Sequence, residues 1–287
     1  MEARSRTNDW RYWHIGELIW DFFMVACHLN PREYIRLWHN PAGELVSYAI
    51  LGDDPSFICQ VSPDYAGWGI EAEALTWAET QKSCLPQREA QAWVGQFSSS
   101  VRQDDAQRIA LLDQHGFHIG EYAEVNMLRS LNEPIPKGTL PVGYQVRSVE
   151  ESDISDRAAA QREVWHPWTV GDVSDADYAR LMLLPGYHRD LDVVAVAPQG
   201  VIASYVNSWI DPDNRIGDFG PVGARVAYRR QGLTRLVLLE GLRRMQVYGM
   251  DRVCVSTGVA NVAAQRLYES IGFQIVNKTL TYVKTDQ

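Results

Sequence analysis

The sequence predicts an α/β protein of the α+β type, with two similar domains in which helices flank a mixed, mostly antiparallel sheet. Residues 217–273 have the pattern strand, glycine turn, helix, strand and short helix. A similar pattern occurs in residues 56–117, and a segment rich in proline and glycine separates the two. The chain has 287 residues, enough for two domains at about 100–200 residues each.

Composition excludes several classes of protein. A hydrophobic content of 46% and a charged content of 22% are those of a chain that can bury a core. The net charge of −9 argues against a nucleic-acid partner, which requires a broad basic face. No apolar run reaches the ~18–20 residues that span a bilayer, and the N-terminus has no signal-type apolar block, so we expect a cytoplasmic protein without a membrane partner.

The cysteines are scattered and have neither Cys-x-x-Cys spacing nor a nearby histidine pair. We therefore expect reduced core residues and no metal site. The cysteines are Cys27, Cys59, Cys84 and Cys254.

The first half is predicted to begin with a buried helix that ends at Asn30-Pro31, followed by a meander of three strands. A helix, a strand and a helix closed by Gly116 come next. The predicted ranges are helix 15–29, strands 36–39, 44–51 and 56–61, helix 72–81, strand 92–97 and helix 106–115.

Residues 132–143 hold three prolines and two glycines, a composition that cannot continue a helix or a central strand. The predicted domains are therefore 1–132 and 140–287. The second domain has the order strand, two helices, three antiparallel strands, helix, strand, helix and closing strands. The predicted ranges are 145–149, 154–165 (capped by Ser152 or Asp153), 175–184, 191–197, 201–210, 219–226, 233–242, 251–257, 261–271, 275 and 279–284.

The turn before the predicted helix at 233 has the features of an anion site. The first amide groups of a helix lack partners and lie at the positive end of its dipole. Gly232 allows close approach of a ligand, and Arg229, Arg230 and Arg235 add positive charge. A phosphate or pyrophosphate fits this turn, although a solvated basic helix start would have the same short motif.

Two motifs together resemble the GCN5-related N-acetyltransferase (GNAT) superfamily. The first is Arg229-x-x-Gly232-x-Thr234, and the second is Leu267-Tyr268-Glu269-x-x-Gly272-Phe273, preceded by Asn261. The family's first motif ends in glycine or alanine, so Thr234 departs from it. Its hydroxyl is expected to be tolerated and to donate to the pyrophosphate.

The resemblance implies that acetyl-CoA binds as co-substrate. The strand end pairs with the pantetheine arm through backbone groups, the turn holds the pyrophosphate, and Asn261 touches the arm. The implied cofactor-binding residues are Ala224, Arg225, Val226, Arg229, Arg230, Gln231, Gly232, Leu233, Thr234, Arg235, Asn261 and Tyr268.

The resemblance also implies direct acetyl transfer to an amine, with Tyr268 protonating the departing thiolate. Asp218 is the predicted base, since strand alternation would place residues 218, 220, 222 and 224 on one face. Many family members have glutamate where this chain has Gly220. His166 and His188 are alternatives in segments expected near the acceptor.

The first half resembles a degraded copy of the second. Residues 65–71 align with 228–234, and 111–117 align with 267–273. The two arginines of the turn are replaced by Ala66 and Gly67, and Glu71 would repel a pyrophosphate. Leu112 replaces the tyrosine. We therefore predict a tandem GNAT protein whose first domain has no cofactor site.

The predicted function is an N-acetyltransferase acting on a primary amine of a small molecule or peptide. A non-catalytic acyl-CoA sensor is the main alternative. An unrelated phosphate-binding protein is a third, but the chain lacks a Gly-Lys-Ser/Thr loop. The acceptor, the use of larger acyl groups and the choice between monomer and homodimer stay open.

Overall fold

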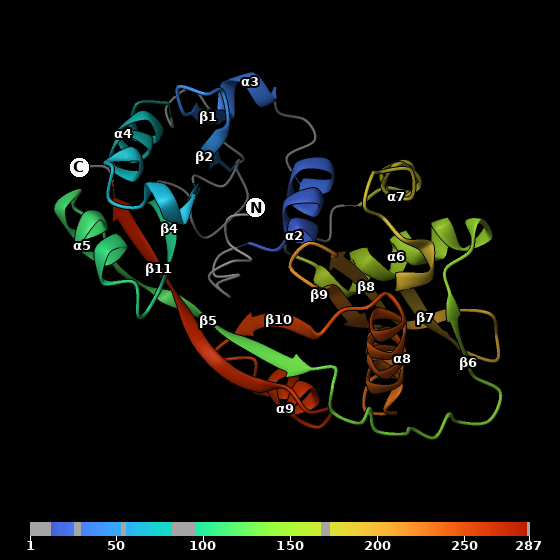
Figure 1. Cartoon of the computed structure of the whole chain (residues 1–287). Coiled ribbons are helices and arrows are strands. Elements are labelled where there is room, and N and C mark those ends of the chain that lie inside the picture. Colours follow the sequence, from blue (N-terminus) through green and yellow to red (C-terminus); the bar gives the residue numbers. More distant parts are fainter. Residues whose placement is uncertain (1–12, 26–29, 53–55, 82–95, 168–172, 286–287) are drawn as a thin grey trace.

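The computed structural model describes residues 13–25, 30–52, 56–81, 96–167 and 173–285. Within these residues one mixed sheet of 11 strands runs through both halves, in the order β1-β2-β3-β4-β11-β5-β10-β9-β8-β7-β6. Helices flank the sheet in both halves (Figure 1). The predicted fold class is confirmed, and the two domains share a single sheet.

The first half begins with helices and a three-stranded meander, as predicted. Its elements are α2 (Ile15–Trp20), η1 (Asp21–Val25), α3 (Pro31–Tyr34), β1 (Ile35–His39), β2 (Leu45–Leu51), β3 (Ser56–Val61), η2 (Pro63–Tyr65), α4 (Ile70–Gln81), β4 (Gln96–Arg102), α5 (Ala106–Gln114) and β5 (His118–Ser130).

Three local predictions in the first half need correction. The helix predicted at 15–29 is α2 continued by the π-helix η1, and residues 26–29 lie outside the described ranges. Asn30, predicted as the end of this helix, begins another in the structure: its side chain accepts from the amide of Arg32 and caps α3. The strand predicted at 92–97 is β4, which extends to Arg102, while residues 92–95 are not described.

The second half follows the predicted order closely. Its elements are β6 (Gln145–Ser148), η4 (Glu151–Asp153), α6 (Ile154–Trp165), α7 (Asp175–Leu181), η6 (Arg189–Leu191), β7 (Asp192–Val196), β8 (Ile202–Asp211), β9 (Ile216–Ala224), η7 (Val226–Tyr228), α8 (Leu233–Val247), β10 (Arg252–Gly258), α9 (Val262–Glu269) and β11 (Gln274–Thr285).

The two long strands β5 and β11 pair with each other and cross between the halves (Figure 1). The last part of β11, from Thr279, pairs with β4 of the first half. The last part of β5, from Glu124, pairs with β10 of the second half. Each half therefore contributes a strand segment to the sheet of the other, and the sequence analysis missed β5 altogether.

Helices cover both faces of the second-half strands. On one face α8 and α9 pack over β8, β9 and β10, around Val237, Leu242 and Tyr268. On the other face α2, α6 and α7 pack around Trp20 and Trp209. We call this second face the α2 face. α2 belongs to the first half of the chain but packs on β8 and β9 of the second half.

A β-bulge changes the side-chain alternation in β9. Val206 of β8 pairs with Val222, whereas Ser208 pairs with Phe219, so β9 has one extra residue there. Asp218 and Gly220 share the α2 face, but Val222 packs against the α8 cluster. The predicted single face for residues 218, 220, 222 and 224 is therefore wrong beyond 220.

The proline-rich segment between the halves packs along α8. A side chain at Gly138 would collide with Leu236, and the side chain of Gln246 donates to the carbonyl of Leu131 (2.7 Å). Cys59 and Cys254 are buried free thiols as predicted, whereas Cys27 and Cys84 lie outside the described ranges. No helix in the described ranges is long and apolar enough to cross a bilayer.

Candidate functional site

The turn before α8 leaves the first amides of that helix without a side-chain cap. Gly232 is the N-cap residue, with φ of 77°, and a Cβ there would meet no atom within 4 Å. No side chain in the described residues accepts from the helix start. The amides of Leu233 and Thr234 can therefore face an anion, aided by the helix dipole.

Arg230 has an unusual backbone conformation. Its φ of 61° lies in the left-handed region, which is unfavourable for a residue with a Cβ. The first half has the same turn, with Gly67 at the equivalent position and φ of 81°. Arg229 and Arg230 are both exposed at the turn. The second half thus has an arginine in a backbone conformation that favours glycine, where the first half has the glycine.

Other side chains hold the turn in place. Gln231 accepts from the hydroxyl of Tyr144 (2.9 Å), and Arg235 donates to the carbonyl of Lys137 (3.4 Å). The hydroxyl of Thr234 lies 3.0 Å from that of Ser204 on β8. Ser204 donates this bond, and the expected contact of the Thr234 hydroxyl with a pyrophosphate stays a prediction.

The end of β9 provides fewer free amides than predicted. The amide of Arg225 donates to Ala203 (3.0 Å), and that of Val226 donates to Glu163 (3.1 Å). Strand alternation directs the backbone groups of Ala224 away from β8, toward β10. The carbonyl of Ala224 accepts from the side chain of Arg229 (3.2 Å), which leaves the amide of Ala224 facing the divergence.

β9 and β10 are parallel neighbours over a short stretch only. Their pairing runs from Ile216 with Arg252 to Asp218 with Cys254, and no later pair exists in the described residues. The strands therefore diverge immediately beyond Asp218. Tyr268 lies at this divergence from the α9 side, and Asn261 caps α9 by accepting from Ala264 (3.2 Å).

Three titratable groups at the divergence, Asp218, Tyr268 and Cys254, are buried, and the pKa of each is raised. Burial raises the pKa of the Asp218 carboxyl, and its Oδ2 has no hydrogen-bond partner among the described residues. Burial, followed by the charge of Asp218, raises the pKa of the Tyr268 hydroxyl. The same two causes raise the pKa of the Cys254 thiol, whose Sγ lies 3.5 Å from Asp218 Oδ1.

The first half contributes α2 to this site. His14 Nδ1 accepts from the amide of Gly16, so Nε2 carries the proton and donates to the carbonyl of Ile216 (3.2 Å). Gly16 fits against Trp209, because a Cβ there would lie 2.0 Å from the indole. These contacts fix Glu17, whose carboxylate accepts from the amide of His14 (2.8 Å).

Glu17, Asp218 and Glu124 form what we call the acidic group. Burial, then the charges of Asp218 and Glu124, raise the pKa of Glu17. Burial raises the pKa of Glu124, which accepts from the hydroxyl of Tyr122 (2.9 Å). The sequence analysis missed Glu17 and Glu124 because they belong to the half without the cofactor motif. The sequence did contain a signal for them, because each is a carboxylate in a segment whose neighbouring residues are buried.

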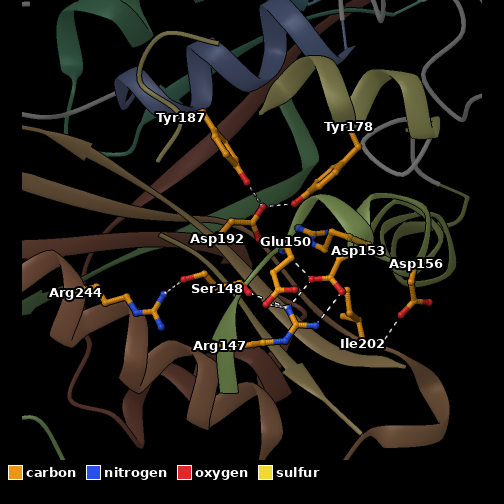
Figure 2. Close-up of polar contacts among 11 residues, drawn as sticks. Arg147, Ser148, Glu150, Asp153, Asp156, Tyr178, Tyr187, Asp192, Ile202 and Arg244 are labelled. Atoms are coloured by element: carbon orange, nitrogen blue, oxygen red, sulfur yellow. Dashed lines mark hydrogen bonds and ion pairs between the residues drawn. The ribbon is translucent and has the colours of Figure 1, made fainter. Parts of the chain in front are cut away.

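A second buried polar cluster, at Asp192, secures α6 and α7. The hydroxyls of Tyr178 and Tyr187 both donate to Asp192 Oδ2, as Figure 2 shows. Asp192 also pairs with the fully buried Arg157 (3.5 Å). Burial raises the pKa of both tyrosines. The cluster holds the helices that cover the α2 face.

The polar contacts around Asp153 differ from the prediction. Asp153 is the N-cap residue of α6, but its carboxylate accepts from Arg147 and from the amide of Glu150 rather than from the helix (Figure 2).

The two histidines predicted as alternatives for the base lie away from the β9–β10 divergence. The ring of His188 meets that of Tyr248 edge-on at the far end of α8, about 24 Å along the helix from Gly232. His166 ends α6 and is exposed.

The equivalent site of the first half is closed by an internal ion pair. Arg108 of α5 is buried and donates to Glu71 (3.2 Å) at the start of α4 and to the carbonyl of Cys59 (2.9 Å) on β3. It also reaches Ser99 on β4. The carboxylate takes the place of an anion at the helix start, and the guanidinium bridges β3 and β4.

The raised pKa of Asp218 predicts that Asp218→Asn stabilises the protein at neutral pH. A carboxyl with a raised pKa in the folded state favours folding below its unfolded pKa and loses that contribution as pH rises. Each kcal/mol gained should raise Tm by about 2–4 °C at pH 7, and the gain should vanish below about pH 4. Thermal unfolding across this pH range measures it. A lower Tm for the variant at pH 7 would contradict the account.

Comparison with known proteins places these features in a family. Residues 158–273 match the model of the acetyltransferase (GNAT) family. A mycothiol acetyltransferase of Thermobispora bispora is 30% identical over 155 residues, which are 51% of this chain and 52% of that protein. The chain thus matches about half the length of that curated relative.

Solved structures match the whole chain. A GCN5-related N-acetyltransferase from Sphaerobacter thermophilus superposes with a TM-score of 0.70 and 20% identity, over 99% of this chain and 89% of that one. A tandem GNAT protein from the clavulanic acid biosynthesis pathway has a TM-score of 0.64 and 14% identity, over 99% and 97%. At this identity the likeness concerns the fold, which includes both halves. In sequence, residues 158–273 are similar to the GNAT family, and over its whole length the chain shares the fold of the tandem GNAT protein.

Proposed function

We propose that the protein is an acyl-CoA-dependent N-acetyltransferase that moves the acetyl group of acetyl-CoA to a primary amine of a small molecule or peptide. The observation that carries the proposal is the position of the β9–β10 divergence. It lies between an uncapped helix start with exposed arginines and a buried pair, Asp218 and Tyr268. The predicted residue roles remain proposals.

The helix start and the strand end are suited to hold the cofactor. The amides of Leu233 and Thr234 and the side chains of Arg229 and Arg230 would bind the pyrophosphate. The amide of Ala224 would pair with the pantetheine arm. The thioester would then lie at the divergence, beside Tyr268.

The residues at the divergence can move the protons that direct transfer requires. An amine reaches the site as an ammonium ion and must lose a proton before it attacks the thioester carbonyl. Asp218 is suited to accept this proton, because a raised pKa makes it a stronger base than an ordinary carboxylate. Tyr268 keeps its proton at neutral pH and can give it to the departing CoA thiolate.

Direct transfer is favoured over a covalent enzyme intermediate. Among the described residues, Cys254 is the thiol at the divergence, and burial and Asp218 raise its pKa well above the ordinary value. A thiol that does not ionise is a poor nucleophile. The amine therefore attacks the thioester itself.

A sensor that binds acyl-CoA without turnover is the second candidate. The ion pair between Arg108 and Glu71 supports it, since a carboxylate occupies the start of α4 in the first-half copy of this turn. The second half has no such pair, and its arginines and tyrosine are present.

Gly232→Glu should weaken acetyl-CoA binding at least about a hundredfold, because it places a negative charge at the pyrophosphate position. Gly69→Glu is the matched control. Gly69 occupies the same turn of the first half, with φ of 82° and an equally open Cβ position, so the backbone strain is equal. Calorimetric titration of both folded variants tests this. Equal affinity in the two variants would locate the anion site elsewhere.

Tyr268→Phe should lower kcat by about 10²–10⁴-fold and leave the affinity for acetyl-CoA nearly unchanged. The ring and its packing persist, and only the proton is lost. A thiol-release assay over a panel of amines measures turnover. If an accepted amine is turned over at the wild-type rate, the acid role of Tyr268 is wrong. If the wild type releases no thiol with any amine while binding acetyl-CoA, the sensor alternative is correct.

A further inference from the structure

Among the described residues, His14 is the side chain whose positive charge acts on the acidic group, and it counteracts the effect of burial on the pKa of Asp218. The groups that set the pKa of Glu17, Glu124 and Asp218 in the described part of the chain include no lysine or arginine. Glu17 accepts from the amide of His14, and Glu124 accepts from the hydroxyl of Tyr122. The charges of Asp218 and Glu124 disfavour the charge of Glu17, and a row of such carboxyls attracts cations.

Asp218 shows the direction in which a ligand would lie. The side chain is 3% exposed, and its Oδ2 is unpartnered among the described residues. A Cβ at Gly220 would lie 3.5 Å from this oxygen. Asp218 Oδ2 therefore points along β9, past its last pair with β10 and into the divergence. A buried carboxylate oxygen without a donor is costly unless a ligand provides one.

The three carboxylates form a row rather than a point. Asp218 pairs with Cys254 on β10, and Glu124 pairs with Gly258 on the other side of that strand. Asp218 and Glu124 lie on the same face of the sheet, because paired residues share a face and so do residues 254 and 258, which are four apart on β10. Asp218 and Glu124 are thus offset by about 13 Å along β10. Glu17 interacts with both.

This spacing excludes a single small ion as the ligand. Among the described residues no three His, Cys, Asp or Glu side chains converge closely enough to hold a metal. Glu17 and Glu124 are only partly buried, so a ligand from solvent can reach them. An extended organic cation matches a row of acids.

We propose that the acceptor is an amine with a second cationic nitrogen, which Glu124 and Glu17 bind while the reacting nitrogen lies at Asp218. The inference rests on the proposed function and specifies its substrate class. Linear diamines and diamino sugars share this chemistry. Glu124 is a specificity residue on an exchanged strand, so the first half selects the substrate that the second half acetylates.

The test compares matched acceptors in the full-length protein. Linear diamines of increasing length, diamino sugars and monoamines of the same carbon skeletons are assayed with acetyl-CoA for thiol release. Glu124→Gln should raise KM for the preferred diamine by about ten- to a hundredfold, with little change in kcat or in KM for the monoamine. Glu121→Gln, an exposed carboxylate of the same strand, is the control.

The outcomes separate this inference from the proposed function. The inference is supported if one diamine series is preferred and if Glu124→Gln loses this preference while Glu121→Gln keeps it. The preferred series shows whether the acceptor is a linear diamine or a diamino sugar. If monoamines are turned over as well as diamines, or if both variants behave alike, the inference is wrong and the acetyltransferase activity stands. If no amine is acetylated, the proposed function itself is contradicted. Unchanged acetyl-CoA affinity and a Tm no lower than that of the wild type show that Glu124→Gln is folded.

Discussion

The antiparallel pairing of β5 with β11 is the constraint on which the rest of the structure depends. Each strand begins in the sheet of its own half and ends in the sheet of the other. The backbone hydrogen bonds of β4 and β10 are therefore completed by the opposite half. Neither half of the shared sheet is complete without the other, which gives a physical reason for the first half to persist.

The exchange also determines how the candidate site is assembled. The uncapped helix start, Asp218 and Tyr268 come from the second half, and the acidic group is completed by Glu17 on α2 and Glu124 on β5. The site keeps several carboxyls in surroundings that disfavour their charge. Such groups reduce stability and are typical of functional sites. The first half, whose own site is closed by Arg108 and Glu71, retains no comparable set among its described residues.

The sequence predicted features that depend on local patterns. The turn at Gly232, the order of elements in the second half and the degraded copy at Glu71 all follow from residue types at fixed spacing. The turn geometry supports the internal repeat closely, since Gly69 and Gly232 have the same left-handed conformation. The domain boundary at 132–140 and the cofactor-binding roles of single residues stay predictions.

Features that depend on long-range pairing could not be predicted in this way. β5 contains Glu121 and Glu124 among apolar residues and has no simple alternation, because it serves two sheets with different surroundings. The bulge at Gly220 shifts Val222 to the other face, and no local signal marks it. The hydroxyl of Thr234 has a partner, Ser204, that is 30 residues away. The docking of α2 on the opposite half likewise depends on Trp209, a residue distant in sequence.

We infer that the single cofactor site, in the second half, depends on β5, a strand of the first half that pairs with β10. Calorimetric titration of acetyl-CoA into the whole chain and into residues 140–287 alone tests it most directly. The account predicts one site per whole chain and no binding by the fragment, which lacks the β5 segment that pairs with β10. Two sites per chain, or a fragment that folds and binds acetyl-CoA with the affinity of the whole chain, would contradict it.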